Sequence, residues 1–258
     1  MGASLTQVRH LAGRSVMRVV RQPALIVPSL LFPLILLAVN ASGLEAATEI
    51  PGFPTDSYIT FALAFAFMQG AMFATLGAGQ SLAEDVQRGF FNRLQLTPLR
   101  GWAMLAGQLA GVVVLGLVQA TVYLSIGLLA GSEMESGPLG VLVLVALSVL
   151  ISLAFGALGL LVALRSGSGE AVQGMFPLFF ILLFLSSASL PRDLIANDWF
   201  QAITNWNPVS YMIEGMRSLF IDGWDAEALA LGFGLAAVLL VAALAAASIA
   251  LKGRMVRT

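Results

Sequence analysis

The sequence has no cysteine, one histidine and one lysine in 258 residues. Without cysteine there is no disulfide, no thiol chemistry and no cysteine-based zinc or iron–sulfur site, and one histidine excludes a histidine cluster. Lys252 is followed by Gly253 and Arg254, whereas a phosphate-binding loop is a glycine-rich turn whose lysine precedes serine or threonine. The sequence therefore predicts no metal site, no cofactor and no nucleotide site of this type in the chain.

Charged residues are also scarce, at 10% of the chain, while 59% of the residues are hydrophobic. A bilayer core about 30 Å thick needs roughly 20 apolar residues of helix to cross it. Six stretches long enough for this contain no Asp, Glu, Lys or Arg: 23–41, 58–82, 102–130, 138–164, 171–190 and 228–251. We therefore expect an all-α polytopic membrane protein with six transmembrane helices.

The lack of acidic and basic side chains at membrane depth bears on mechanism. A proton-driven carrier needs a titratable group within its spans, and an enzyme needs paired carboxylates or a base beside a nucleophile. The six stretches offer amides and hydroxyls instead, such as Gln69 and Gln119. We expect no catalytic residue, so either an external energy source or passive conduction is left open.

The basic residues are unevenly distributed along the chain. Eleven of the thirteen Lys and Arg residues lie before the first stretch, between stretches two and three, between four and five, or after the sixth. Only Arg192 and Arg217 lie in the complementary segments. Because short loops rich in Lys and Arg stay in the cytoplasm, both termini are predicted to be cytoplasmic. A multi-pass protein of the bacterial plasma membrane fits this pattern.

Residues 1–22 form an amphipathic pattern at helical spacing. Leu5, Val8, Ala12, Val16 and Val19 share one face, and the opposite face carries His10, Arg14, Met17, Arg18 and Arg21. The pattern favours an interfacial helix with its arginines among anionic headgroups. An unstructured basic tail is the alternative.

A row of aromatic and methionine side chains marks the second stretch, and a row of phenylalanines marks the fifth. Such surfaces adapt to bulky ligands, so together they are candidates for a path taken by an amphiphilic substrate. The alternative is that they pack the bundle or face lipid. The residues concerned are Tyr58, Phe61, Phe65, Met68, Met72, Phe176, Phe180 and Phe184.

The loop 83–100 combines charge with exposed apolar side chains. Glu84 and Asp85 lie at its start, where carboxylates favour a helix N-terminus, and Pro98 ends it. Phe90 and Leu94 need a cover. The loop either docks on a partner that supplies ATP hydrolysis or rests on lipid headgroups.

Two segments resemble the ABC-2 type permeases, the transmembrane subunits of one class of ATP-binding cassette exporters. In the loop, the similarity to the coupling-helix pattern of this family is carried by Glu84, Asp85, Gly89, Leu94, Thr97, Pro98 and Leu99. The C-terminal pattern is carried by Pro177, Ser186, Ser187, Leu190, Pro191, Leu194, Trp199, Phe200, Ile203, the run from Asn207 to Tyr211, Glu214 and Arg217. The sequence from Asn207 to Arg217 is most similar to that of the daunorubicin-resistance-type permeases.

The resemblance implies a single transmembrane domain over 1–258. It comprises an interfacial helix (1–22), a cytoplasmic coupling loop (83–100) and an extracellular segment of short re-entrant helices (191–226). Such a permease exports a hydrophobic or amphiphilic drug, lipid or glycolipid. A separate ATPase subunit binds the ATP and Mg, and a second permease, identical or related, completes the transporter. Membrane lipids are the other expected partners, and no nucleic acid is expected.

The same resemblance assigns two sets of residues. Contact with the ATPase falls to Glu84, Asp85, Gly89, Phe90, Arg93, Leu94 and Pro98, and an extracellular gate to Pro191, Trp199, Asn207, Pro208, Tyr211, Glu214 and Arg217. Glu214 and Arg217 either pair with each other or act at the leaflet boundary. A self-contained channel or facilitator, and a membrane-embedded assembly factor, are the competing functions.

Overall fold

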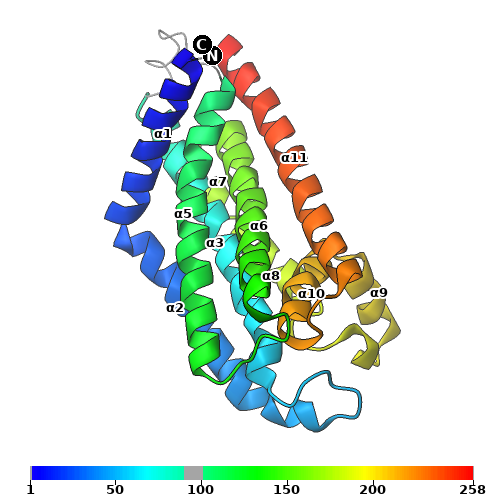
Figure 1. The fold of residues 1–258 in the computed structure, drawn as a ribbon. Coiled ribbons are helices and arrows are strands. Elements are labelled where there is room, and N and C mark those ends of the chain that lie inside the picture. The colour runs from blue at the N-terminus through cyan, green and yellow to red at the C-terminus, as the bar shows by residue number, and fades with distance from the viewer. Residues whose placement is uncertain (1, 90–100, 258) are drawn as a thin grey trace.

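The computed structural model describes residues 2–89 and 101–257. All regular secondary structure assigned in these residues is helical. Within these residues, five helices are long and apolar enough to cross a membrane. They pack side by side as a bundle, with α1 (Gly2–Arg21) alongside (Figure 1). The five are α2 (Pro23–Leu44), α3 (Tyr58–Gln87), α5 (Gly101–Leu129), α6 (Gly137–Ser166) and α11 (Ala226–Arg257). Long helices are therefore confirmed for five of the six predicted stretches.

The stretch 171–190 does not form the single long helix that was expected. It contains the short helices α7 (Gly169–Gln173) and α8 (Phe176–Phe184), separated at Gly174 and Met175. Pro177 stands in the first turn of α8, where its missing N–H group costs least. The helical segment Gly169–Phe184 is shorter than the roughly 20 residues of a full crossing.

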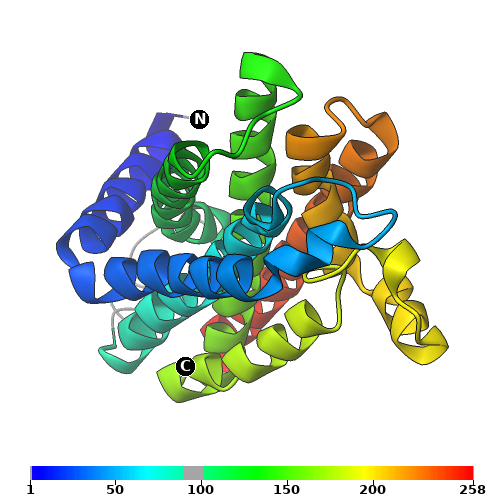
Figure 2. The same ribbon diagram turned by 90° about the horizontal axis from the view of Figure 1, so that it is seen from below.

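Short helices gather at the end of the bundle opposite the termini. They are the 3₁₀ helices η1 (Glu45–Glu49) and η2 (Arg192–Leu194), followed by α9 (Asp198–Trp206) and α10 (Pro208–Ile221). Both views show α9 standing off to one side of the bundle (Figures 1 and 2). The prediction of short helices between the fifth stretch and the last one is confirmed.

The two ends of the chain lie at the same end of the bundle (Figure 1). Here Arg18 of α1 donates to the Ser81 carbonyl of α3, and Arg254 of α11 donates to the Leu164 carbonyl of α6. We call this the basic end. Helices α1, α3, α6 and α11 thus carry basic residues to the same end of the bundle, as the distribution of arginines in the sequence predicts.

The core forms around α3, whose side chains are buried along most of its length. Small residues allow its neighbours to approach closely. Gly70 lies against the ring of Tyr123 in α5, and Gly159 of α6 lies against the backbone of Thr75. Thr75 also donates its hydroxyl to the Phe155 carbonyl of α6 at 2.9 Å. This close contact between α3 and α6 thus depends on a residue without a Cβ.

We predict that Gly159→Ala destabilises the protein. A Cβ at this position would collide with the backbone carbonyl of Thr75, which cannot rotate away. The expected loss is about 1–3 kcal/mol, measured as a lower melting temperature in detergent. Gly234→Ala in α11 is the control, because nothing lies within 4 Å of its added Cβ. Alanine there should be neutral or stabilise by up to about 1 kcal/mol. Equal melting temperatures for the two variants would contradict the packing described.

Candidate functional site

Asp85 is a buried carboxylate at the basic end of the bundle. It lies in the last turn of α3, with its side chain 2% exposed. One oxygen accepts hydrogen bonds from Arg14 at 2.5 Å and Arg18 at 2.8 Å, and the other accepts from the Gln108 amide at 3.1 Å. A buried carboxylate is stable only when it is paired in this way. We call Arg14, Arg18 and Asp85 the arginine clasp.

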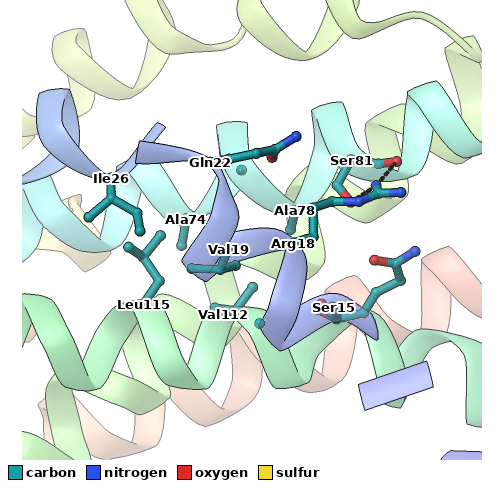
Figure 3. Close-up of a pocket in the computed structure, with 13 residues that line it drawn as sticks. Ser15, Arg18, Val19, Gln22, Ile26, Ala74, Ala78, Ser81, Val112 and Leu115 are labelled. Atoms are coloured by element: carbon teal, nitrogen blue, oxygen red, sulfur yellow. Dashed lines mark hydrogen bonds between the residues drawn. The ribbon is translucent and has the colours of Figure 1, made fainter. Parts of the chain in front are cut away.

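The clasp joins α1 to α3, and Gln108 links it to α5. Arg18 also donates to the carbonyl of Ser81 at 2.9 Å and to its hydroxyl (Figure 3). On α5, the Gln108 carbonyl accepts from the hydroxyl of Ser15 at 2.9 Å. Residues four apart lie on the same face of a helix, so Arg14 and Arg18 of α1 face Ser81 and Asp85 of α3. These contacts fix the position of α1 along its neighbours.

A small crevice lies beside the clasp, enclosed by α1, the start of α2, α3 and α5 (Figure 3). Arg18, Gln22 and Ser81 contribute polar atoms to it, while Ala74 and Leu115 are among its apolar walls. Its volume of about 40 Å³ suffices for a few water molecules. A bulky amphiphile therefore does not fit this crevice as it stands.

The arginines of α1 do not all point where the sequence suggested. The helix predicted for 1–22 is confirmed, and the unstructured tail is wrong. However, Arg14 and Arg18 turn into the bundle toward Asp85, while Met17 and Val20 are exposed. Hydrophobic periodicity does not register that a neighbouring helix carries a buried carboxylate. The expectation that the whole arginine face meets headgroups is corrected in this respect.

The coupling residues predicted in 83–100 are described only in part. Helix α3 continues to Gln87, so Glu84 and Asp85 stand at the end of that helix and not at the N-terminus of a loop helix. Carboxylates are disfavoured near a helix C-terminus, and each has a basic partner: Asp85 in the clasp, Glu84 with Arg88 at 3.4 Å on the surface. Gly89 follows at φ 65°, and the remaining members of the set, Phe90, Arg93, Leu94 and Pro98, lie outside the described residues.

The two rows predicted to line a substrate path have different surroundings. Every member of the α3 row is buried inside the chain: Tyr58, Phe61, Phe65, Met68 and Met72. The α8 row lies nearer the surface, and Phe184 is 55% exposed. The ring centroids of Phe65 and Phe184 are 6.4 Å apart, so the structure brings the two rows together at this point.

The α8 phenylalanines belong to a larger aromatic cluster that the sequence did not reveal. Phe176 and Phe180 are 4.7 Å apart, and Phe180 and Phe184 are 6.0 Å apart. Phe32 of α2 lies 5.8 Å from Phe180, and Phe73 of α3 lies 5.0 Å from Phe176. We call these five residues the phenylalanine row. Figure 2 shows α2 and α8 on the same flank of the bundle.

Arg217 is a buried cation near the opposite end of the bundle, 6% exposed. It donates to the Phe61 carbonyl at 3.1 Å, the Ser187 carbonyl at 2.9 Å and the Ala188 carbonyl at 3.0 Å. Its guanidinium also lies 3.6 Å from the centroid of the Phe61 ring, in cation–π geometry. Arg217 thus connects α10 to the start of α3 and to the chain that follows α8.

The partner of Glu214 is Arg192 and not Arg217. Arg192 Nε donates to Glu214 Oε1 at 2.6 Å, and Arg192 Nη2 donates to Glu214 Oε2. The guanidinium stacks on Tyr211 at 3.9 Å, and the Tyr211 hydroxyl donates to the Asn205 carbonyl at 2.8 Å. The suggestion that Glu214 pairs with Arg217 is therefore wrong. Sequence reasoning missed Arg192, although it is one of only two basic residues on the predicted outer side.

The other predicted gate residues differ in their surroundings. Asn207 donates its amide to the carbonyls of Leu182 and Leu185, at 2.6 and 2.9 Å, and its Oδ1 accepts from the Val209 N–H. It therefore completes the end of α8 and begins α10, in which Pro208 occupies the first turn. Trp199 of α9 is exposed.

A hollow of about 420 Å³ opens beside these residues. This volume matches that of sites for small organic molecules. Burial raises the pKa of the Asp222 carboxyl, the nearby Asp225 raises it further, and Arg217 opposes the shift. Among the lining residues are Phe61, Pro191, Arg192, Asp193, Tyr211, Glu214, Arg217, Asp222, Asp225 and Glu227. Charge, aromatic rings and open volume therefore meet at this end.

We predict that Arg217→Met destabilises the protein strongly. The change leaves the carbonyls of Phe61, Ser187 and Ala188 without this donor. The Phe61 carbonyl keeps the hydrogen bond of its own helix, so two carbonyls are left unpaired. Each unpaired buried group costs about 1–3 kcal/mol, so the total loss should reach at least about 2 kcal/mol. Thermal unfolding in detergent measures it, with the exposed Arg165→Met as control. Equal melting temperatures for Arg217→Met and Arg165→Met would show that these hydrogen bonds contribute little to stability.

Comparisons with known proteins place the chain among transporters. The sequence model of the family described as ABC-2 type transporter matches residues 6–221. The daunorubicin resistance ABC transporter permease protein DrrB1 of Streptomyces coeruleorubidus is 32% identical over 171 residues, covering 64% of this chain and 58% of that protein. The putative transport permease ycf38 of Pyropia yezoensis is 27% identical, and the match covers 84% of this chain and 74% of that protein. The probable multidrug ABC transporter permease YbhR of Escherichia coli K12 is 25% identical, and the match covers 58% of this chain and 42% of that protein.

Proposed function

Because the chain belongs to the ABC-2 type transporter family, as a permease and thus a transport subunit, we propose that it exports a hydrophobic or amphiphilic substrate from the cytoplasm or the inner leaflet. The family match over residues 6–221 carries this proposal. A drug, a lipid or a glycolipid fits the substrate class, and the names of DrrB1 and YbhR favour a drug.

The energy is proposed to come from ATP and Mg bound on a separate subunit. An ABC transporter permease implies an ATP-binding partner, and the sequence has no phosphate-binding loop ending in Lys before Ser or Thr. Two permease copies, identical or related, would enclose the path. Alternation between inward-facing and outward-facing states would then move the substrate.

The segment 169–190 is proposed to supply a sixth crossing. Both termini lie at the same end of the bundle, which requires an even number of crossings, and five long helices provide an odd number (Figure 1). Helix α8 consists wholly of apolar residues and proline. A crossing here would place the basic end in the cytoplasm of a bacterium, in accord with the distribution of arginines. Helices α9 and α10 would then lie at the outer leaflet as the gate.

The substrate path is proposed to follow the flank formed by α2 and α8. This flank exposes the phenylalanine row at Phe32 and Phe184, together with aliphatic side chains such as Leu31 and Ile35 of α2. The buried α3 row would contact substrate only after α8 moves away from Phe65. The hollow near Arg217 would lie at the exit of this path.

We predict that Phe180→Ala combined with Phe184→Ala lowers export. Loss of both rings removes the stacking surface between α2 and α8. Efflux of daunorubicin from vesicles containing the permease and its ATPase should fall about tenfold, which corresponds to about 1.4 kcal/mol of lost interaction. Leu178→Ala is the matched control, because Leu178 is an equally exposed residue of α8 outside the row. Equal losses in the double variant and the control would place the path elsewhere.

We also predict that Glu84→Arg uncouples ATP hydrolysis from transport. Glu84 is half exposed at the end of α3, before the segment proposed to dock on the ATPase. Charge reversal should lower transport-coupled ATPase activity severalfold while membrane insertion persists. Asp56→Arg, an exposed charge reversal at the other end of the bundle, is the control. Unchanged coupling would remove Glu84 from the docking surface, and flux from the permease alone without nucleotide would favour the self-contained channel.

A further inference from the structure

We propose that Asp85 is a positioning residue that makes α1 move together with the end of α3, so that α1 passes motion of the ATPase to α2. This inference rests on the proposed function. It concerns the arginine clasp, to which sequence reasoning gave no role as a unit. In the competing picture, α1 lies loosely among headgroups and follows the bundle only through its link to α2.

The contacts of α1 resist sliding. Arg14 and Arg18 both bind one oxygen of Asp85, and Arg18 also binds Ser81. Arg14 and Arg18 stand one turn apart, so moving α1 along α3 by one helical turn, about 5.4 Å, would take at least one of the two arginines out of reach of Asp85. Asp85 is only 2% exposed, so its carboxylate depends on the arginines and Gln108 for solvation. Breaking one side of a buried pair is far more costly than breaking an exposed pair, because it leaves a buried charge without a partner.

Close packing against α5 strengthens the same attachment. A Cβ added at Gly107 would lie 2.5 Å from the Cβ of Leu11, and one added at Gly111 would lie 2.5 Å from the hydroxyl of Ser15. The backbones of α1 and α5 therefore approach closely at two successive turns. Since α5 begins at Gly101, the clasp and these contacts attach α1 to both helices that flank residues 90–100.

The other end of α1 is joined directly to α2. Gln22 is the single residue between Arg21 and Pro23, and Pro23 cannot continue the helical hydrogen bonding because it lacks an N–H group. Motion of α1 therefore reaches α2 through one residue. Helix α2 carries Phe32 of the phenylalanine row, so a displacement at the basic end would reach the proposed path through α1.

A distance measurement between two spin labels tests this inference. The absence of native cysteine allows His10→Cys on α1 and Arg88→Cys at the end of α3 to be labelled selectively. Both side chains are exposed. In the complex with the ATPase, in vesicles, we expect one narrow distance that is the same without nucleotide and in the ATP-trapped state. With Asp85→Asn added, the distribution should broaden and change between the two states.

A functional readout accompanies the distances. Asp85→Asn should lower the amount of daunorubicin transported per ATP hydrolysed at least fivefold, with transport and hydrolysis measured in the same vesicles. Glu170→Gln is the matched control, because it removes an exposed carboxylate near the basic end and should change neither readout. If Asp85→Asn does not insert, Arg18→Lys replaces it. This variant keeps the charge but loses the paired N–H groups, so we expect a smaller decrease in transport per ATP than for Asp85→Asn.

Two results would overturn the inference. One is a distance that changes between nucleotide states in the unmodified clasp. The other is an Asp85 variant with the parent distances and the parent transport per ATP. Either result, obtained while ATP still drives export, leaves the proposed function intact. Failure of any ATPase to copurify with the permease would count against the proposed function itself.

Discussion

Helix α3 is held near both of its ends by buried charge, and the arrangement of the other helices depends on this. At the basic end its own carboxylate, Asp85, attracts two arginines of α1. At the other end Arg217 of α10 donates to the backbone of Phe61. In a low-dielectric interior such groups cannot be left unpaired, so each determines where its partner helix lies. Between the two ends, apolar packing and small residues bring α5 and α6 onto α3.

The sequence was sufficient for much of the fold because hydrophobic length is a local property. Five long helices and the amphipathic helix α1 follow from residues that are neighbours in the chain. The stretch 171–190 has the same composition but forms two short helices, with Pro177 in the first turn of the second. The amide of Asn207 binds the carbonyls at the end of α8. These hydrogen bonds join residues more than twenty positions apart, so the periodicity of the sequence cannot predict them.

The candidate sites were harder to predict for the same reason. Glu214 and Arg217 have the spacing of a helical pair, yet Arg192 binds Glu214 from 22 residues away. Arg14 and Arg18 have the spacing of a headgroup-binding face, yet they bind Asp85 more than sixty residues away. In each case the local rule identified a charged residue correctly but not its partner. The tertiary structure brought in a partner from a distant part of the chain.

The position of Arg217 also bears on how the protein is made. A cation is costly to carry across a bilayer, and Arg217 ends up close to the outer side of the proposed topology. All of its acceptors, the carbonyls of Phe61, Ser187 and Ala188, belong to segments that leave the ribosome before it does. During synthesis the charge therefore arrives after the groups that solvate it, and biogenesis need not expose an unsolvated guanidinium to lipid.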